Sequence, residues 1–298
     1  MSAKMSPLPQ VAPRISPKTA TALGIGAILL WATLASLTAL KGPIPPFETT
    51  AIVFAIGGAL MVFVAAARGR ARLLRPTPAS LALGVYGLFI YHALYFAALS
   101  LAPPAEASLI TSLWALLTVL FSGLLPGHRL RLAHVAGALL GFAAAVLLVH
   151  DKLGAGSAAA GARWGYVLAL GCAFVWSSYS VASRLLAAVP SESLAAPSLI
   201  AAALAGLCSL AFETWVAPAG WTAWAALVAL GLGPLGAAFL LWDIGMKQGN
   251  VPLLGVLSYA ALILSTALLV ALGFAEPVWT LAAACALMVA AALVATRK

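Results

Sequence analysis

The sequence predicts an all-α integral membrane protein with ten transmembrane helices, arranged as two inverted five-helix repeats around a central cavity. The first observation behind this prediction is composition: of 298 residues, 64% are hydrophobic and only 8% are charged. With a mean hydropathy of +1.09, the chain has more apolar surface than one globular core can hide, which is typical of polytopic membrane proteins. The second observation is a series of ten hydrophobic runs, and the third is the placement of the basic residues.

Prolines, glycines and charges divide the chain into hydrophobic runs of about 20 residues, the length that crosses roughly 30 Å of hydrocarbon. In the first half the runs are separated by prolines at 43–46 and 103–104 and by the arginine-rich segment 68–75. The predicted helices of this half are 19–40, 47–67, 79–100, 104–125 and 132–150. The second half is divided in the same way, for example at Asn250-Val251-Pro252, and its predicted helices are 164–187, 192–214, 221–245, 252–272 and 277–296.

The basic residues indicate how these helices are oriented. Under the ten-helix arrangement, all of the 16 Lys and Arg except Lys41, Lys152 and Arg163 fall on one side of the membrane. Because loops rich in Lys and Arg stay in the cytoplasm, both termini are predicted to be cytoplasmic. An arrangement of nine or eleven helices would remove this asymmetry.

Residues 1–18 are predicted to be a disordered cytoplasmic tail. They contain Lys4, Arg14, Lys18 and four prolines but no apolar segment, so they do not resemble a signal peptide. Targeting then depends on the first hydrophobic helix.

The rest of the chain divides into two related repeats, 19–150 and 164–296. A shift of 145 positions places Trp31 on Trp176, and the same shift places Trp114 on Tyr259. Since each repeat holds five helices, an odd number, the second repeat enters the membrane from the opposite side. Inverted repeats of this kind are typical of transporters that bind their substrate near the bilayer midplane.

Other classes of function are disfavoured by what the chain lacks. Its three cysteines, Cys172, Cys208 and Cys285, lie in apolar runs without metal-ligand or CxxC spacing, so no metal, cofactor or disulfide is predicted. No cluster of carboxylates, histidines or cysteines shares a depth, so we predict no catalytic residues and no enzyme. The basic residues flank membrane helices rather than a folded polar surface, which excludes nucleic acid as a partner. Short loops and small tails suggest no obligatory protein partner, which leaves membrane lipid and a small-molecule substrate.

The segment Tyr91-His92-Ala93-Leu94-Tyr95 is the first candidate for a substrate site. Tyr91, His92 and Tyr95 share one face of a helix inside an otherwise apolar run. Hydrogen-bonding groups in hydrocarbon need a partner, so this stripe is predicted to face a protein interior or a watered cavity. The alternative is that each group bonds to a neighbouring helix and serves packing only.

Three tryptophans are predicted to line the same cavity, because Trp31, Trp114 and Trp176 each lie near the middle of a helix, where an indole N–H has no water unless a cavity brings it. Tyr179 follows Trp176 and is a further candidate, while the serines beside it suit helix packing as well as a site. Tyr259 is predicted to serve the cavity or its gate. The other six tryptophans, Trp164, Trp215, Trp221, Trp224, Trp242 and Trp279, fall near helix ends and are interpreted as membrane-interface residues.

Charged side chains are predicted to avoid the cavity. The absence of Lys and Arg at mid-depth argues against phosphate-bearing substrates, and the absence of carboxylates argues against proton-coupled export of cationic drugs. His92 is positioned to hydrogen-bond a zwitterion or to carry a proton. Glu106, after Pro103-Pro104 at a predicted extracellular gate, is a candidate for gating or for proton transfer, with stabilisation by the helix dipole as the simpler explanation.

These residues resemble the drug/metabolite transporter superfamily, EamA type. The likeness covers nearly the whole chain and includes the equivalent Trp31 and Trp176, the run Gly245-Met246-Lys247-Gln248-Gly249, and Gly273-Phe274-Ala275-Glu276. The sequence departs from the family after the fourth helix, where Gly127-His128-Arg129 replaces the usual glutamate. Within the superfamily, Tyr91, His92 and Tyr95 with Trp114 and Trp176 are similar to the cavity residues of bacterial aromatic amino-acid exporters.

The residues and the resemblance together favour one substrate class. An aromatic amino acid needs stacking faces, available from Trp31, Trp114 and Trp176, and a few donors and acceptors, available from Tyr91, His92, Tyr95 and Tyr179. We therefore predict a bacterial inner-membrane exporter of aromatic and other large neutral amino acids that works by alternating access. The alternative left open is an exporter of other neutral metabolites or lipophilic drugs.

Overall fold

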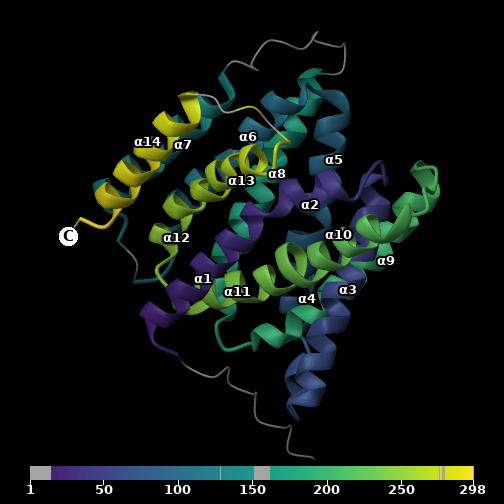
Figure 1. Ribbon diagram of the computed structural model, residues 1–298. Coiled ribbons are helices and arrows are strands. Elements are labelled where there is room, and N and C mark those ends of the chain that lie inside the picture. Colours follow the sequence, from purple (N-terminus) through teal and green to yellow (C-terminus); the bar gives the residue numbers. More distant parts are fainter. Residues whose placement is uncertain (1–14, 128, 151–161, 275, 277–278, 298) are drawn as a thin grey trace, which may run out of the picture.

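A computed structural model describes residues 15–127, 129–150, 162–274, 276 and 279–297 (Figure 1). All regular secondary structure in these residues is helical, as the sequence predicts. The parts of the sequence predictions that lie outside the described residues are positions 1–14 of the tail, His128, the connection 151–161 between the halves, Ala275, positions 277–278 and Lys298.

Seven helical stretches are long and apolar enough to cross a membrane: Pro17–Leu40, Pro46–Ala67, Pro78–Leu101, Ala162–Leu186, Ser191–Phe212, Gly220–Gln248 and Val251–Ala271. Three shorter apolar helices complete the series, at Glu106–Ser122, Leu132–Leu147 and Trp279–Ala295. Each of the ten predicted ranges overlaps one of these stretches. That all ten cross the membrane stays a prediction.

Several helices of the first half begin at prolines, whose missing N–H costs nothing in the first turn. Pro46 and Pro104 begin α3 and α6, and Pro17 begins α1 one residue before the predicted end of the tail, with Ser16 as its N-cap. The elements are α1 (Pro17–Ala32), α2 (Leu34–Leu40), α3 (Pro46–Ala67), η1 (Ala71–Leu74), α4 (Pro78–Val85), η2 (Tyr86–Ile90), α5 (Tyr91–Leu101), α6 (Pro104–Ser122) and α7 (Leu132–Val149). The first predicted helix is interrupted at Thr33, and the third contains the π-helical turn η2.

The second half repeats this order with its own interruptions. Its third helix contains the π-helical turn η6, and its fourth is divided at Ser258. The elements are α8 (Ala162–Ser183), η4 (Arg184–Leu186), η5 (Ser191–Leu194), α9 (Ala195–Phe212), α10 (Gly220–Leu232), η6 (Gly233–Ala237), α11 (Ala238–Gln248), α12 (Val251–Leu257), α13 (Tyr259–Ala271) and α14 (Trp279–Ala295).

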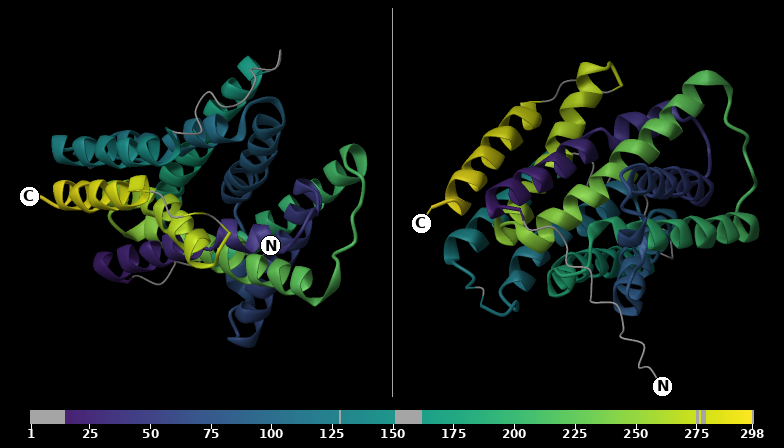
Figure 2. Two further views of the ribbon diagram at one scale, coloured as in Figure 1. Left: turned by 45° about the horizontal axis from the view of Figure 1, so that its top comes forward. Right: turned by 90° about the horizontal axis from the view of Figure 1, so that it is seen from below.

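The packing of the helices keeps its pattern when the halves are exchanged. The second helices of the halves, α3 and α9, pack together, as do the fifth helices α7 and α14 (Figure 2). The contact of α1 with α11 has its counterpart in the contact of α8 with α5. The main core lies where these helices converge, and it includes the buried ring of Trp176.

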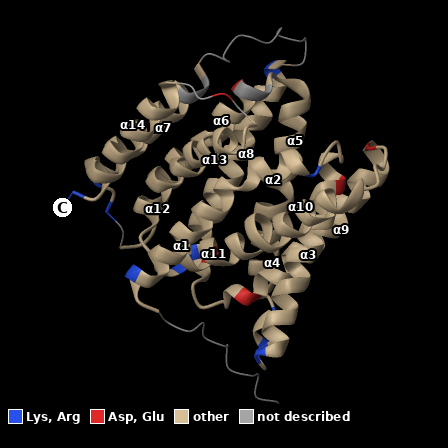
Figure 3. Ribbon diagram, in the orientation of Figure 1, with Lys and Arg blue, Asp and Glu red and all other residues tan. Residues whose placement is uncertain are grey.

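At the end where α1 begins, hydrogen bonds join the two halves. The N–H of Ile15 donates to Gln248 Oε1 at 3.0 Å, and the N–H of Asn250 donates to Thr21 Oγ1 at 2.9 Å. These bonds fix the start of α1 against the end of α11. Figure 3 shows basic residues gathered toward this end.

At the opposite end two carboxylates, the buried Glu48 and the half-buried Glu213, join α3 to the end of α9. Glu213 accepts from the N–H groups of Phe47 and Glu48 at 2.8 and 2.9 Å, and so caps α3 from outside the helix. Glu48 in turn accepts from the N–H of Val216 at 2.9 Å. Burial lowers the pKa of the nearby Lys41 ammonium, and the two carboxylates act in the other direction. The second and seventh predicted helices are therefore held together through backbone groups.

Candidate functional site

Six aromatic residues from both halves meet in one cluster, with Trp176 at its centre. The ring of Trp176 lies 5.7 Å from Trp31 and 6.1 Å from Trp114, centroid to centroid. Its other ring contacts are with Tyr91 at 5.1 Å, Tyr179 at 5.3 Å and Phe239 at 5.5 Å. The three tryptophans predicted at mid-depth therefore do come together. Edge-to-face and tilted contacts of this kind hold rings in fixed orientations.

The predicted Tyr91–Tyr95 stripe extends this cluster. Tyr91 and Tyr95 stack nearly in parallel at 6.1 Å, and His92 lies edge-on to Tyr91 at 5.1 Å. All three side chains are half-buried. On its other side, His92 contacts the ring of Phe54 from α3 at 5.1 Å. The stripe is therefore part of the same site as the tryptophans.

Two π-helical turns position key side chains of the site. In η2 the carbonyl oxygen of Leu88 lies 2.6 Å from Nδ1 of His92, so this nitrogen carries the proton and Nε2 is left as an acceptor. In η6 the carbonyl of Pro234 accepts from the indole N–H of Trp31 at 2.9 Å. A π-helical turn frees carbonyls from the regular helical pattern and is frequent at functional sites.

The indole N–H groups of the other two tryptophans remain available. Among the described residues, no group accepts a hydrogen bond from Trp114 or Trp176, and neither nitrogen is among the fully buried polar atoms. An indole N–H that is neither bonded nor sealed faces accessible space. Trp114 and Trp176 can therefore donate to a bound molecule, whereas the N–H of Trp31 is already used.

The serines that follow Trp176 mostly bond to their own helix. Ser177 and Ser178 donate to the carbonyl of Phe174 at 3.1 and 2.7 Å. Ser180 accepts from the indole N–H of Trp242 at 3.0 Å. Of these hydroxyls, that of Ser180 links α8 to α11, which agrees with the packing interpretation of the serines.

Glu106 lies in the first turn of α6, and the hydroxyl of Tyr166 on α8 donates to its carboxylate. This contact joins two helices at the end away from η4. A role of Glu106 in gating or in proton transfer stays a prediction, as does the simpler role of stabilising the first turn of α6.

Tyr259 lies apart from the cluster. Its buried ring packs against Gly141 on α7 and lies 6.3 Å from Phe142. The start of α13 turns this side chain toward α7 and α14 rather than toward Trp176. The sequence shift of 145 aligns it with Trp114, which packs against the core around Tyr259 as well as against the core around Trp176.

Trp242 corrects one interpretation made from the sequence. It was assigned to the membrane interface because it falls near the end of its predicted helix, yet it is 1% exposed and lies 5.1 Å from Trp31 and 5.8 Å from Trp114. The physical reason is that the end of α11 packs on α1 inside the bundle. The position of Trp242 near the end of the predicted helix 221–245 could not reveal its burial, since the depth of that helix end depends on tertiary packing.

Three more residues of the site were not selected from the sequence, and of these only Tyr86 carried a polar signal there. Phe239 and Phe54 stack at 5.6 Å, and both contact His92. Tyr86, in η2, shares a hydrogen bond of 2.9 Å with Ser178. Phenylalanines in apolar helices look alike whether they face lipid or a site, so sequence alone cannot select these two.

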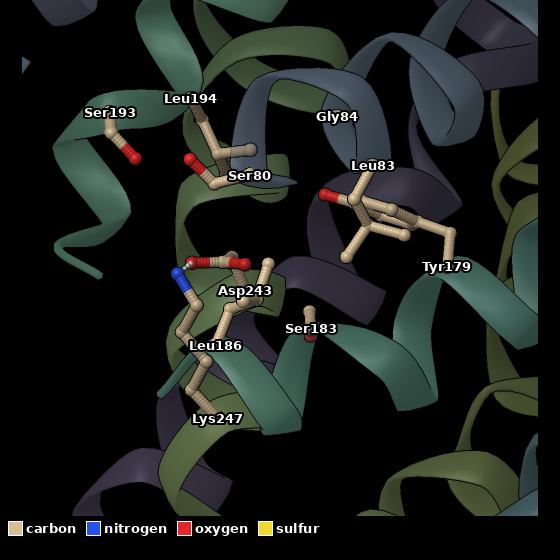
Figure 4. A pocket seen from close by; sticks show the side chains of 10 residues that line it. All are labelled: Ser80, Leu83, Gly84, Tyr179, Ser183, Leu186, Ser193, Leu194, Asp243 and Lys247. Atoms are coloured by element: carbon tan, nitrogen blue, oxygen red, sulfur yellow. Dashed lines mark ion pairs between the residues drawn. The ribbon is translucent and has the colours of Figure 1, made fainter. Parts of the chain in front are cut away.

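A small cavity lies beside Tyr179 of the cluster (Figure 4). Lys247 Nζ lies 2.7 Å from Asp243 Oδ2, both side chains are almost fully buried, and the ammonium also donates to the carbonyl of Val189. Arg184 donates to the carbonyl of Gly249 at 2.7 Å. The cavity holds about 20 Å³, room for roughly one water, and is lined by Ser80, Leu83, Gly84, Tyr179, Ser183, Leu186, Ser193, Leu194, Asp243 and Lys247.

Within the described residues, no group of three or more His, Cys, Asp or Glu is arranged to hold a metal ion. The side chains of the cluster offer aromatic faces, neutral donors and acceptors. This chemistry suits the binding and release of a neutral or zwitterionic aromatic molecule.

Comparison with known proteins adds to this geometry. The model of the EamA-like transporter family matches residues 18–150 and again residues 163–297. The aromatic amino acid exporter YddG of Ancylobacter novellus is 54% identical over 284 residues, which cover 95% of this chain and 98% of that protein. The protein of the same name from Salmonella typhimurium is 26% identical over 263 residues, 84% of this chain and 87% of its own. A crystal structure with 54% sequence identity gives a TM-score of 0.90 and covers 94% of this chain and 97% of that one.

Proposed function

The chain belongs to the EamA-like transporter family, and on that premise we propose that it exports aromatic and other large neutral amino acids across the inner membrane. The observation that carries the proposal is the ring cluster around Trp176, built by helices from both halves. The name of the 54% identical relative, an aromatic amino acid exporter, supports the same substrate class.

The cluster offers two kinds of contact to a substrate, aromatic stacking and hydrogen bonds. Trp114 is half-buried and offers a face on which an aromatic side chain stacks, with about 0.5–1.5 kcal/mol for a ring pair. Trp176 is 3% exposed and holds the surrounding rings in place. Nε2 of His92 is an acceptor for the ammonium group, and the free indole N–H groups are donors for the carboxylate. The protein groups in these bonds are uncharged, so the substrate is held without an ion pair and is released readily.

We assign the two halves as inverted repeats with both termini in the cytoplasm. Three observations support this assignment: the family model matches each half separately, the helix packing keeps its pattern when the halves are exchanged, and each half has a π-helical turn in its third helix. The excess of Lys and Arg on one side sets the direction.

Alternating access then requires one end to close while the other opens. The end near the termini carries the closing contacts: the buried Asp243–Lys247 pair, the bonds of Arg184 and the link from Asn250 to Thr21. The cluster itself stays accessible, because Tyr91 and His92 are only half-buried and two indole N–H groups are free. We therefore assign the described conformation as one that is closed to the cytoplasm.

Counterflow in proteoliposomes tests the proposal. Vesicles that hold the purified protein and unlabelled phenylalanine should accumulate labelled phenylalanine, and labelled threonine should exchange more slowly. An uncharged lipophilic dye serves as the third substrate, because a neutral aromatic cluster also suits neutral drugs and other metabolites. Exchange of the dye without exchange of phenylalanine would replace the proposal with that second candidate.

A further inference from the structure

A basic pocket lies away from the aromatic cluster, where α7 and α12 begin. It is lined by Arg129, Arg131, His134, Asn250, Val251 and Pro252, and its volume is about 340 Å³. We propose that this pocket binds the phosphate headgroup of an anionic phospholipid from the cytoplasmic leaflet. The inference does not depend on which substrate is exported, and it uses the proposed topology only to name the leaflet.

The segment before α7 holds two guanidinium groups on one side. Leu130 packs inward against Gly123 and the core beneath it, and the backbone at Arg131 is extended. Because side chains alternate along an extended chain, Arg129 and Arg131 both project outward, and both are exposed. Two guanidinium groups at this spacing match the oxygens of a phosphodiester.

The other groups of the pocket are donors as well. Nδ1 of His134 accepts the N–H of Arg131 at 3.4 Å, so the neutral ring carries its proton on Nε2. The side-chain oxygen of Asn250 caps α12 by accepting from the N–H of Leu253 at 3.1 Å, which leaves its NH₂ group to donate. Buried Val251 and Pro252 form the floor.

No acidic side chain of the described residues balances this charge. The ion pairs that join described residues are Arg70–Glu192 and Lys247–Asp243, and neither involves the pocket. Ala295, near the end of the antiparallel α14, packs against Gly137 on α7, so the exposed Arg297 adds a further positive charge at the same end. An uncompensated positive pocket attracts an anion.

The neighbouring surface indicates a lipid rather than a free phosphate. Leu132 directly follows Arg131 and is 88% exposed, and Leu139, seven residues on, is 52% exposed. These residues share a face of α7 with exposed Ala136. An apolar strip that rises from a basic pocket fits a phospholipid, with its headgroup on the arginines and an acyl chain along the leucines. Basic pockets between transmembrane helices on the cytoplasmic side commonly bind such headgroups.

Native mass spectrometry of the full-length protein in detergent tests this inference. Phosphatidylglycerol and phosphatidylcholine of matched acyl chains are titrated against the wild type and against Arg129→Gln/Arg131→Gln. The wild type should prefer phosphatidylglycerol, and the double variant should bind it about 30-fold more weakly, as expected for two basic groups near a membrane surface. The matched control is Arg72→Gln/Arg75→Gln, which removes the same charge from exposed residues on the same predicted side outside the pocket.

Three outcomes would overturn the inference. One is an equal loss of binding in both double variants, because the effect would then be net charge alone. Another is equal binding of the two lipids by the wild type. The third is displacement of phosphatidylglycerol by millimolar inorganic phosphate in the wild type and not in Arg129→Gln/Arg131→Gln, which would assign the pocket to free phosphate. None of these results depends on transport, so failure here leaves the export proposal standing.

Discussion

The two π-helical turns, η2 in the first half and η6 in the second, occupy the same place in their halves but are held in different ways. The carbonyl of Leu88 in η2 is bonded by His92, four residues further along the same helix stretch. The carbonyl of Pro234 in η6 is bonded by Trp31 from the other half. The two halves thus share the π-helical turn but use its free carbonyl differently. In η2 the carbonyl orients the polar ring of His92 toward the site, and in η6 it fixes the indole ring of Trp31.

The causes of the two turns also differ. Pro234 has no N–H for the preceding turn of its helix, which by itself favours a widened turn. No proline is present in η2, and there the side chain of His92 competes for the carbonyl of Leu88. The structure of η2 therefore depends on a residue of the site, whereas that of η6 is set by its own sequence.

The largest effect on transport is expected from substitution of Trp176, whose ring contacts side chains from both halves. Trp176→Ala removes ring contacts with five neighbours and should lower phenylalanine transport at least about tenfold, given roughly 1 kcal/mol for each ring pair. The matched control is Trp164→Ala on the same helix, since Trp164 is 66% exposed. Initial rates of counterflow measure both variants, and size-exclusion profiles check that they fold. Equal rates in the two would reduce Trp176 to a packing residue.

Variants of His92 should distinguish the contribution of hydrogen bonding to transport from that of ring stacking. His92→Leu removes the donor to Leu88 and the acceptor for substrate, so transport should be severely reduced. His92→Gln keeps one donor and one acceptor and should lose only severalfold. Because we expect the ring to bind substrate rather than carry a proton, an imposed pH gradient should change wild-type uptake little. Proton-driven accumulation in the wild type that His92→Gln alone abolishes would make His92 the proton carrier.

A glycine within each of the two turns provides a test of their close packing. A Cβ at Gly87 would lie 2.2 Å from the ring of Tyr179, and one at Gly236 would lie 2.2 Å from the carbonyl oxygen of Gly231. Gly87→Ala and Gly236→Ala should each cost about 1–3 kcal/mol of stability, seen as a lower Tm. Gly26→Ala, whose Cβ would be an ordinary 3.5 Å from Leu241, is the control. Unchanged Tm in the first two variants would show that the turns adjust freely.

The smallest effect on transport is expected from substitution of Trp31, whose indole ring is held by the carbonyl of Pro234 in η6. Trp31→Phe keeps an aromatic face but leaves the carbonyl of Pro234 without its donor, a loss of about 1–3 kcal/mol for a buried group. The variant should melt at a lower temperature and still exchange phenylalanine within about threefold of the wild type. A large loss of exchange with unchanged Tm would mean that the N–H of Trp31 acts on the substrate.

The sequence predicted the parts of the fold that local chemistry decides. Pro46 and Pro104 begin helices because proline suits the first turn. Asp243 and Lys247 form an ion pair at the spacing of four residues that brings side chains together on a helix. Trp31, Trp114 and Trp176 could be selected by depth, since an indole in mid-membrane needs a protein or watered surrounding.

What the sequence missed depends on how helices rotate and pack. Tyr259 was predicted to serve the cavity or its gate; the rotation of α13 turns its ring toward α7, and whether it acts at a gate stays a prediction. Trp242 was assigned to the interface, but α11 carries it into the cluster. The turn η2 has no proline or comparable local signal, so only the tertiary structure reveals it.

The central claim is that the cluster around Trp176 binds the transported amino acid, and the position of a bound ligand tests it most directly. Crystals grown with 4-bromophenylalanine would locate the bromine by anomalous scattering. We expect the peak among the rings of Trp31, Trp114 and Trp176, with Nε2 of His92 in hydrogen-bonding distance of the ligand's polar end. A bromine peak outside this cluster, with none inside it, would contradict the claim.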